Sequence, residues 1–545
     1  MLHMNIFQPK IIESLRNYNK KQFVSDIVAG IIVAIIALPL SIALAIASGV
    51  APEKGLYTAI VAGFVIALLG GSSVNISGPT AAFATIVAGI VAQYGMSGLV
   101  LATIMAGVIL IIMGICRFGS LIKYIPHTIT TGFTSGIALT IVIGQIKDFM
   151  GLTFAEGTHA VETMEKVSAV AGSISTTNLQ AVLVGLIALA ILIVWPKVNK
   201  KIPGSLIAVI AGVIIVKLFG MNVNTIGDLY TISGNLPMPS LPEFNIGAIK
   251  QLSTSAFTIA ILAAIESLLS CVVSDGMIND KHNSNTELIA QGAGNIFSGI
   301  FGGIPATGAI ARTAANVKNG GCTPVSGIVH AIVLLLILVV FMPYAAWIPM
   351  PVIAAILFMV AYNMCEWREF VKICKTAPKS DIIVLVLTFI LTVVFDLVVA
   401  IEFGLIVTAF LFMKRMSDVT RIRAWIDEGS SENDRLKKIP ANTQVFEFDG
   451  PMFFATSDVI SSIPLTEGTK KVILRMRNIP SLDVSALAAL EELHNECRRN
   501  DIKVIFSHVN KQPMKVMKKS GFYKNVGEEY FMENIDDALS FAEKE

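Results

Sequence analysis

The sequence predicts an α-helical membrane protein of about fourteen apolar segments, followed by a small α/β domain. Composition supports this prediction first: 54% of the 545 residues are hydrophobic and only 15% are charged, whereas soluble domains carry about 25% charged residues. Length supports it second, because single soluble cores stop growing near roughly 250–300 residues. We therefore expect a lipid environment, and the composition excludes an ordinary soluble enzyme.

The first 24 residues are expected to be a cytoplasmic segment at the membrane surface. Residues 1–24 mix charged residues such as Glu13 and Arg16 with isolated apolar ones. This pattern is typical of a short amphipathic helix, and it lacks the features of a cleavable signal peptide.

Apolar runs follow one another from Asp26 to Met413, and several approach the roughly 20 residues that cross a bilayer. We therefore expect a transmembrane domain over residues 25–414. Clear spans are expected to begin near Ile27, Tyr57, Leu99, Thr128, Ala181, Leu206, Thr254, Val325, Val352 and Ile382. Shorter or interrupted segments are expected to begin near Thr80, Ile289, Thr307 and Ile401.

Short basic loops indicate the orientation of these segments. Lysine and arginine cluster at both ends of the transmembrane domain and in three short loops: Arg117 with Lys123; Lys197 with Lys200 and Lys201; and Arg368 with Lys372, Lys375 and Lys379. With an even number of segments, all basic loops fall on one side, which the positive-inside rule makes the cytoplasmic side. Both chain ends are then expected in the cytoplasm, and the protein in the cytoplasmic (inner) membrane.

The composition changes near Arg415, where residues 415–440 are polar and charged and are predicted to be a linker. Residues 441–545 are predicted to form a small cytoplasmic domain. Strands are expected at Gln444–Phe448, Lys471–Arg475 and Ile502–Phe506, and helices at Ser485–Asn500, Gln512–Ser520 and Ile535–Glu543. Strands that alternate with helices are typical of an α/β domain.

Two segments contain breaks that exclude a plain membrane-spanning helix. Residues 75–80 (NISGPT) and 302–307 (GGIPAT) carry glycine and proline, and a short apolar segment follows each. Each is the third segment of its half, which is typical of transporters built from inverted repeats. The helix starts near Thr80 and Thr307 would then face each other, with free N–H groups that suit an anion. The alternative is two kinked spans without a ligand.

Two ionisable side chains stand in apolar surroundings. Glu266 lies near the middle of the run Thr254–Val273, and Arg312 lies in the short segment after Pro305. Such residues are costly in lipid and mark functional sites; the alternative is a structural ion pair between the two. Ser270 lies on the Glu266 face of its helix, where its hydroxyl could bind a substrate or bond to its own helix.

Five motifs carry a resemblance to a known family. They are PLSIALA at residues 39–45, GLY at 55–57, NISGPT at 75–80, AIESLLS at 264–270 and RTAANVKNGG at 312–321. As a set they resemble the SulP anion permeases, also called the SLC26 family. The resemblance implies seven plus seven inverted helices, arranged as a core and a gate domain around an anion site. It also implies a homodimer and a C-terminal STAS domain, with LDVSA at 482–486, that could bind a protein partner.

The resemblance also implies the residues of the anion site, which lies between the third and tenth helices of the family. The positions carried over for substrate binding are Thr80, Ala81, Ala306, Thr307, Ala311 and Arg312, and Ser270 joins them from its place beside Glu266. Sodium–bicarbonate members have a neutral residue at the Arg312 position and an aspartate at the Glu266 position. The Glu–Arg combination therefore indicates coupling to protons, with Glu266 as the group that takes and releases the proton.

The resulting hypothesis is secondary active transport of a small inorganic anion, sulfate-like or bicarbonate-like, or of a dicarboxylate. The coupling would be proton symport with an elevator or rocking motion. The alternatives are an anion channel or exchanger, sodium-coupled bicarbonate uptake, and a nucleobase permease, which the STAS tail disfavours. No HExxH, GxSxG or Walker A motif occurs, so an enzyme is not expected. The six cysteines are scattered, and neither a metal nor a cofactor is expected.

Overall fold

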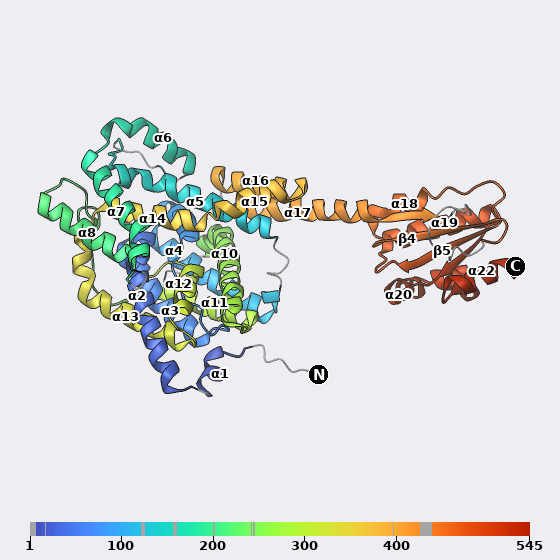
Figure 1. Ribbon diagram of the computed structural model, residues 1–545, viewed down its shortest axis with the longest axis horizontal. Coiled ribbons are helices and arrows are strands. Elements are labelled where there is room, and N and C mark those ends of the chain that lie inside the picture. The colour runs from blue at the N-terminus through green and yellow to red at the C-terminus, as the bar shows by residue number, and fades with distance from the viewer. Residues whose placement is uncertain are drawn as a thin grey trace. The chain divides into compact units, whose positions relative to one another are not determined.

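The computed structural model describes residues 7–16, 18–120, 126–155, 160, 162–199, 202–240, 242, 246–395, 397–425 and 439–544. The chain forms two compact units, Met1–Leu405 and Ile406–Glu545 (Figure 1). The first unit is helical, whereas the second contains a five-stranded sheet.

Helices joined by short connections make up most of the first unit (Figure 1). Its α-helices are α1 (Lys10–Arg16), α2 (Lys20–Ala47), α3 (Pro52–Leu69), α4 (Ala84–Ile115), α5 (His127–Met150), α6 (Thr163–Ser173), α7 (Leu179–Val198), α8 (Gly204–Phe219), α9 (Ile226–Leu229), α10 (Ile246–Ile278), α11 (Ser284–Ile300), α12 (Ile310–Lys318), α13 (Val325–Phe341), α14 (Met350–Met364), α15 (Trp367–Thr376) and α16 (Lys379–Val394). The next helix, α17 (Leu397–Val419), begins in the first unit and ends in the second. The 3-10 helices are η1 (Ala81–Phe83), η3 (Ile174–Thr176) and η4 (Met342–Trp347). Two short strands, β1 (Ser77–Gly78) and β2 (Thr307–Gly308), interrupt the helical pattern.

Eight helices in the described part of the chain are long and apolar enough to cross a membrane, and α8 is a shorter apolar helix. One of the eight, Ala81–Ile115, contains the two segments predicted to begin near Thr80 and Leu99. Gly95 divides it, with φ 64° and ψ −170°, a conformation open essentially to glycine alone. The shorter helices α11, α12 and α16 supply segments predicted near Ile289, Thr307 and Ile382.

The N-terminal region differs from the prediction in where the first membrane helix begins. α2 starts at Lys20 rather than near Ile27. Asn19 explains this start, because its side chain accepts a hydrogen bond from Gln22 N at 3.0 Å while the Gln22 side chain accepts one from Asn19 N at 3.1 Å. The predicted boundary at residue 24 therefore falls within α2.

The helices of the first unit pack as two groups. In the core group, α11 packs against α3 and α4, α13 against α2 and α3, and α10 against α4 and α12. In the gate group, α5 packs against α14 and α16, and α7 against α8 and α14. Each group combines helices from both halves of the chain, as expected for the core and gate of the predicted fold.

Close backbone contact holds α4 against α11 within the core group. A Cβ added at Gly107 of α4 would lie 2.6 Å from Gly292 O, and a Cβ added at Gly292 of α11 would lie 2.5 Å from Gly107 O. Only glycine fits at either position, and the absence of side chains lets the two backbones approach closely. The contact fixes α11 beside the helix that follows the first break.

The second unit is a mixed sheet with the strand order β3–β4–β5–β6–β7, in which β3 is antiparallel to β4 and the other pairs are parallel. Neighbouring strand residues pack on opposite faces: Phe446 contacts the cluster that includes α19, and Val445 contacts the cluster that includes α22. Its elements are β3 (Arg421–Ala424), β4 (Thr443–Asp449), η5 (Phe454–Thr456), α18 (Ser457–Ser461), β5 (Lys471–Asn478), α19 (Val484–Arg499), β6 (Lys503–Ser507), α20 (Lys511–Ser520), α21 (Phe522–Val526), η6 (Glu528–Tyr530), β7 (Phe531–Met532) and α22 (Ile535–Lys544).

Part of the predicted linker is structured. α17 continues to Val419, and β3 pairs with β4 between the partners Arg421↔Asp449 and Ala424↔Phe446. β3 was not predicted from the sequence, because this short strand is mostly exposed and lies within a polar stretch. Several positions used in the predictions lie outside the described residues: 426–438 of the linker, and the loop residues Lys123, Lys200 and Lys201.

We expect Gly292→Ala to destabilise the protein by roughly 1–3 kcal/mol, because the new methyl group would overlap a backbone oxygen of the neighbouring helix. The measurement is the apparent melting temperature in detergent. Gly89→Ala is the matched control, since a Cβ at Gly89 meets no atom within 4 Å. Equal melting temperatures for the two variants would contradict the close contact between α4 and α11.

Candidate functional site

The two predicted breaks lie side by side in the core group. β1 and β2 pair in antiparallel fashion, with Ser77 opposite Gly308 and Gly78 opposite Thr307. Ala309 N extends the pairing by donating to Ile76 O at 2.9 Å. Backbone that leaves a helix at membrane depth must find polar partners inside the protein, and here each break supplies partners for the other.

Buried side chains satisfy the remaining backbone groups of the second break. Asn295 of α11 accepts a hydrogen bond from Ala306 N at 2.8 Å and donates to Ala306 O at 2.9 Å. Thr307 is fully buried, and its hydroxyl donates to Ala263 O of α10 at 2.8 Å. The side chain of Ala306 is also fully buried. Ala306 and Thr307 therefore hold the backbone of the break, and neither side chain is exposed.

A helix begins immediately after each break. η1 begins at Ala81 after Thr80, and α12 begins at Ile310 after Ala309. Neither Thr80 nor Ala309 caps its helix with a side-chain hydrogen bond. The first N–H groups of both helices therefore lack side-chain caps, and the positive ends of both helix dipoles lie next to the breaks. Ala311, in the first turn of α12, is exposed, whereas Ala81 is buried.

Arg312 lies at the second helix start and is 1% exposed. Its Nη2 donates to Pro79 O of the first break. Its Nε and Nη1 have no hydrogen-bond partner among the described residues. Nη1 lies against Gly78, where any Cβ would overlap it. A buried guanidinium with two unsatisfied donor nitrogens is costly unless a further acceptor binds there, so this group points to an anionic or polar ligand.

Glu266 lies on α10 beside the first helix start. Its Oε2 accepts a hydrogen bond from the Thr80 hydroxyl at 2.8 Å, and both side chains are half-buried. The alternative of an ion pair between Glu266 and Arg312 is not seen in the described part of the chain, because the Arg312 contact is to the Pro79 backbone. Glu266 therefore lies beside the first helix start and has no cationic partner among the described residues.

Ser270 bonds to other elements of the core group rather than to its own helix, which was one of the two roles considered from the sequence. Its side chain is fully buried, and its hydroxyl donates to Asn75 Oδ1 at 2.8 Å and to Thr313 Oγ1 at 3.1 Å. It therefore links α10 to the first break and to α12. This contact could not be anticipated from helical spacing, because the partners are far away in the sequence.

Two buried ionisable residues near the breaks escaped the sequence analysis. Glu287 of α11 is fully buried and accepts hydrogen bonds from four donors. His330 of α13 is fully buried, and both of its ring nitrogens lack a partner among the described residues. The criterion that identified Glu266 and Arg312, an ionisable residue within an apolar segment, would also have identified these two.

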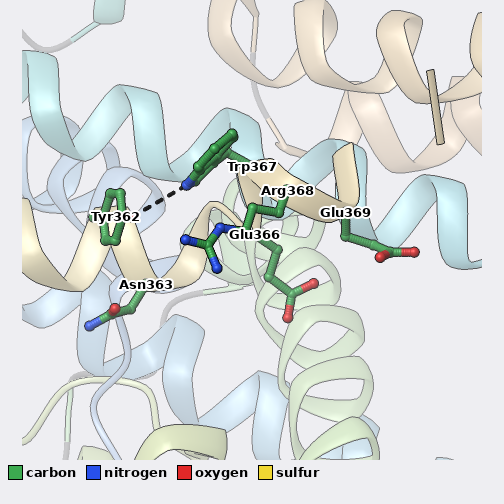
Figure 2. Close-up of a pocket in the computed structure, with 6 residues that line it drawn as sticks. All are labelled: Tyr362, Asn363, Glu366, Trp367, Arg368 and Glu369. Atoms are coloured by element: carbon green, nitrogen blue, oxygen red, sulfur yellow. Dashed lines mark hydrogen bonds between the residues drawn. The ribbon is translucent and has the colours of Figure 1, made fainter. Parts of the chain in front are cut away.

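Other surfaces offer weaker candidates. Figure 2 shows an open surface pocket where α14 meets α15, in which Trp367 Nε1 donates to the Tyr362 hydroxyl at 3.4 Å. Its lining residues are Tyr362, Asn363, Glu366, Trp367, Arg368 and Glu369. Most of them are exposed, so solvent can satisfy their polar groups. Within the described residues, no group of three or more His, Cys, Asp or Glu side chains could hold a metal ion.

Comparison with known proteins shows likeness along nearly the whole chain. Residues 23–388 match the Sulfate permease family, and residues 435–539 match the STAS domain. The chain is 39% identical to the putative sulfate transporter YvdB of Bacillus subtilis, over 96% of this chain and 98% of that protein. It is 30% identical to the bicarbonate transporter BicA of Picosynechococcus, over 95% of this chain and 94% of that protein.

Solved structures show the same likeness. The overall structure of SLC26A9 superposes with a TM-score of 0.86 at 19% identity, over 98% of this chain and 92% of that one. The transmembrane domain of the cyanobacterial bicarbonate transporter BicA superposes with a TM-score of 0.62 at 30% identity, over 72% of this chain and 98% of that one. These matches confirm the predicted fold class, a helical membrane transporter followed by a STAS domain.

We expect Asn295→Leu to destabilise the protein by roughly 2 kcal/mol or more, because it leaves the N–H and C=O groups of Ala306 buried without partners. Asn363→Leu, at an exposed position in the pocket of Figure 2, is the control and should have little effect. Apparent melting temperatures in detergent provide the comparison. Wild-type stability of the Asn295 variant would show that the second break does not depend on the two hydrogen bonds between Asn295 and Ala306.

Proposed function

Because the chain belongs to the sulfate permease family, we propose that it carries a small inorganic anion across the cytoplasmic membrane together with protons. The observation that carries this proposal is the pairing of two uncapped helix starts beside the buried Arg312. The sections of chain that form this pairing come from opposite halves of the transmembrane domain.

Anion binding follows from the electrostatics of the site. Two helix N-termini contribute partial positive charge and free N–H donors. Arg312 adds a full positive charge and two nitrogens that have no partner among the described residues. An anion at the helix starts would satisfy these donors by charge-assisted hydrogen bonds, which are roughly twice as strong as neutral ones. Thr80 and Ala311, which are half-buried and exposed respectively, would border the bound anion.

The proposed substrates are a sulfate-like or bicarbonate-like anion, or a dicarboxylate. The relatives support this range, because one is named a putative sulfate transporter and the other a bicarbonate transporter. Sulfate and bicarbonate both present oxygen acceptors that match the N–H donors of the site. Choosing between them requires competition of many anions against one labelled anion in reconstituted vesicles.

Proton coupling is proposed for Glu266. A carboxyl group beside an anion site can lower the cost of binding by taking up a proton, and can release that proton when the anion leaves. The fixed charge of Arg312 disfavours a second cation such as sodium in the same place. The hydrogen bond from Thr80 to Glu266 holds the carboxyl group next to the first helix start. A bound anion there would favour the protonated form of this group.

Transport is proposed to occur by movement of the core group against the gate group. η1, the first turn after the break, contacts α5 of the gate group. The proposed site therefore lies at the boundary between the two groups. Relative movement of packed groups around a fixed site is the general means by which such repeats alternate access.

We also propose a homodimer with both termini in the cytoplasm. The basic loops on one predicted side support this orientation, and family resemblance supports the dimer. The STAS domain would then lie in the cytoplasm, where it could contact a protein partner.

The anion site is tested by two variants that perturb Arg312 differently. Arg312→Ala removes the charge and should raise the KM for anion uptake roughly tenfold or more, because hydrogen bonds to charged groups contribute about 1.5–3 kcal/mol. Gly78→Ala keeps the charge but displaces the guanidinium, because its Cβ would overlap Nη1; KM should rise by a smaller factor.

Uptake of labelled sulfate and bicarbonate into proteoliposomes provides the measurement, and Gly276→Ala, whose Cβ meets no atom within 4 Å, is the control. Full anion affinity in Arg312→Ala would remove this residue from the binding site.

Proton coupling is tested by Glu266→Gln. Wild-type uptake should rise when the vesicle exterior is made more acidic than the interior, because protons then move inward with the anion. The variant keeps a hydrogen-bond acceptor for Thr80 but cannot take up a proton, so its uptake should no longer respond to the proton gradient. An unchanged response would exclude Glu266 as the coupling group.

Ion replacement and electrical recording separate the alternatives. Sodium-dependent uptake without a response to the proton gradient would favour sodium coupling. Stimulation by anion on the opposite side of the membrane would favour exchange. Large unitary currents would favour a channel.

A further inference from the structure

Glu287 is the centre of a network of buried polar groups that are hydrogen-bonded to the first break. Glu287 lies in the first turn of α11 and is fully buried. Its Oε2 accepts a hydrogen bond from Gly71 N at 2.9 Å, and its Oε1 accepts from Asn75 Nδ2 at 2.8 Å, Ser267 Oγ at 3.0 Å and Gln291 Nε2 at 3.0 Å. All four partners donate, so they together match the acceptor capacity of a carboxylate.

Through Asn75, the carboxylate of Glu287 determines which way an amide group faces. Asn75 donates its nitrogen to Glu287, which leaves Oδ1 to accept from the hydroxyls of Ser270 at 2.8 Å and Thr313 at 3.0 Å. The Thr313 hydroxyl in turn accepts from Ile76 N at 3.0 Å. This chain of hydrogen bonds runs from α11 through the first break to α12.

Through Gln291, the same carboxylate is linked to β1. Gln291 Nε2 donates both to Glu287 Oε1 and to Ser77 Oγ at 3.0 Å. Glu287 therefore holds the segment just before the first break, at Gly71, and also the place where the first break pairs with the second, at Ser77. Each link in this network is a hydrogen bond to a buried group, so its side chains have few alternative orientations.

We propose that Glu287 is a positioning residue for the anion site: it fixes the first break and the start of α12 so that Arg312 and both helix starts converge. This inference rests on the proposed function, since it assigns Glu287 to the same site. Arg312 is adjacent in sequence to Thr313, the last link of the network, and its Nη2 bonds to Pro79 of the first break. Glu287 itself does not touch the anion.

A purely structural role is the competing explanation, and Asp26 provides a matched control for it. Asp26 is also a fully buried carboxylate that accepts several hydrogen bonds, from the Tyr18 hydroxyl at 2.9 Å, Cys322 N at 2.8 Å and Thr323 N at 3.2 Å. These bonds join α2 to the loop after α12, at the end of that helix opposite the breaks. Loss of Asp26 should affect stability without changing the helix starts.

The experiment compares Glu287→Gln, Glu287→Asp and Asp26→Asn in the full chain. In Glu287→Gln, an NH2 group replaces one carboxylate oxygen and faces a donor, so the network must rearrange. We expect the KM for labelled sulfate or bicarbonate in proteoliposomes to rise roughly tenfold or more, with a smaller change in kcat. Glu287→Asp retains the carboxylate and should recover part of the loss.

Asp26→Asn should lower the apparent melting temperature but leave KM within about twofold of the wild-type value. An unchanged KM in Glu287→Gln, or an equal rise of KM in Asp26→Asn, would overturn the proposal. Gln291→Met serves if Glu287→Gln does not fold, because it matches glutamine in size and removes the link between Glu287 and Ser77 while the other three donors to Glu287 stay in place. It should raise KM by a smaller factor, and an unchanged KM there also counts against the proposal.

Amide hydrogen exchange separates this inference from the proposed function, because it requires no anion. Exchange in residues 71–78 and 307–313 should become faster in Glu287→Gln but not in Asp26→Asn. If the wild-type protein moves no anion and these amides still depend on Glu287, then the proposed function fails while the positioning of the breaks by Glu287 stands. If the wild type moves anions and the amides are insensitive to Glu287, then only the positioning role fails.

Discussion

The pairing of β1 with β2 is the constraint on which the rest of the transmembrane unit depends. Lipid offers no hydrogen-bond partners, so backbone that leaves a helix at membrane depth must be satisfied by protein. Ser77–Gly78 and Thr307–Gly308 provide this for each other, and Asn295 satisfies Ala306. Once both breaks are stable, two helix starts without side-chain caps lie next to each other inside the protein, which a continuous helix could not provide.

The arrangement of charge in this unit follows from the same constraint. Arg312 donates to the carbonyl of Pro79, so the guanidinium stabilises the first break, while its Nε and Nη1 have no partner among the described residues. Glu266 and Glu287 lie on two different helices, α10 and α11, and their contacts differ in kind. Within the part of the chain that the structure describes, Glu287 is fully buried and accepts from four donors, whereas Glu266 is half-buried and accepts from one donor, Thr80. These different surroundings match the two roles proposed above, a positioning residue for Glu287 and the coupling group for Glu266.

Patterns local in the sequence predicted much of this structure. Composition and apolar periodicity predicted the helical membrane unit, and glycine with proline in NISGPT and GGIPAT predicted both breaks. Strand alternation predicted β4, β5 and β6 of the second unit. Glu266 and Arg312 were identified because each is a charged residue within an apolar segment.

What the sequence could not predict depends on contacts between distant residues. Ser270 bonds to Asn75, 195 positions away, and Glu287 bonds to Gly71, 216 positions away, so no periodicity reveals either contact. β3 was not predicted from the sequence, because it is only four residues long and lies within a polar, charged stretch. Gly95 was not recognised as the point where two segments divide, because a glycine conformation with positive φ leaves no mark in composition.

The distance in sequence between the two breaks also bears on how the protein is made. Pro79 and Arg312 are separated by 233 positions, so a ribosome releases the first break long before its partner exists. Until then, the nascent chain holds polar backbone at a depth where lipid cannot satisfy it. The insertion machinery must therefore keep this stretch hydrated or shielded, and the unit can close around its interior only when synthesis has passed the second break.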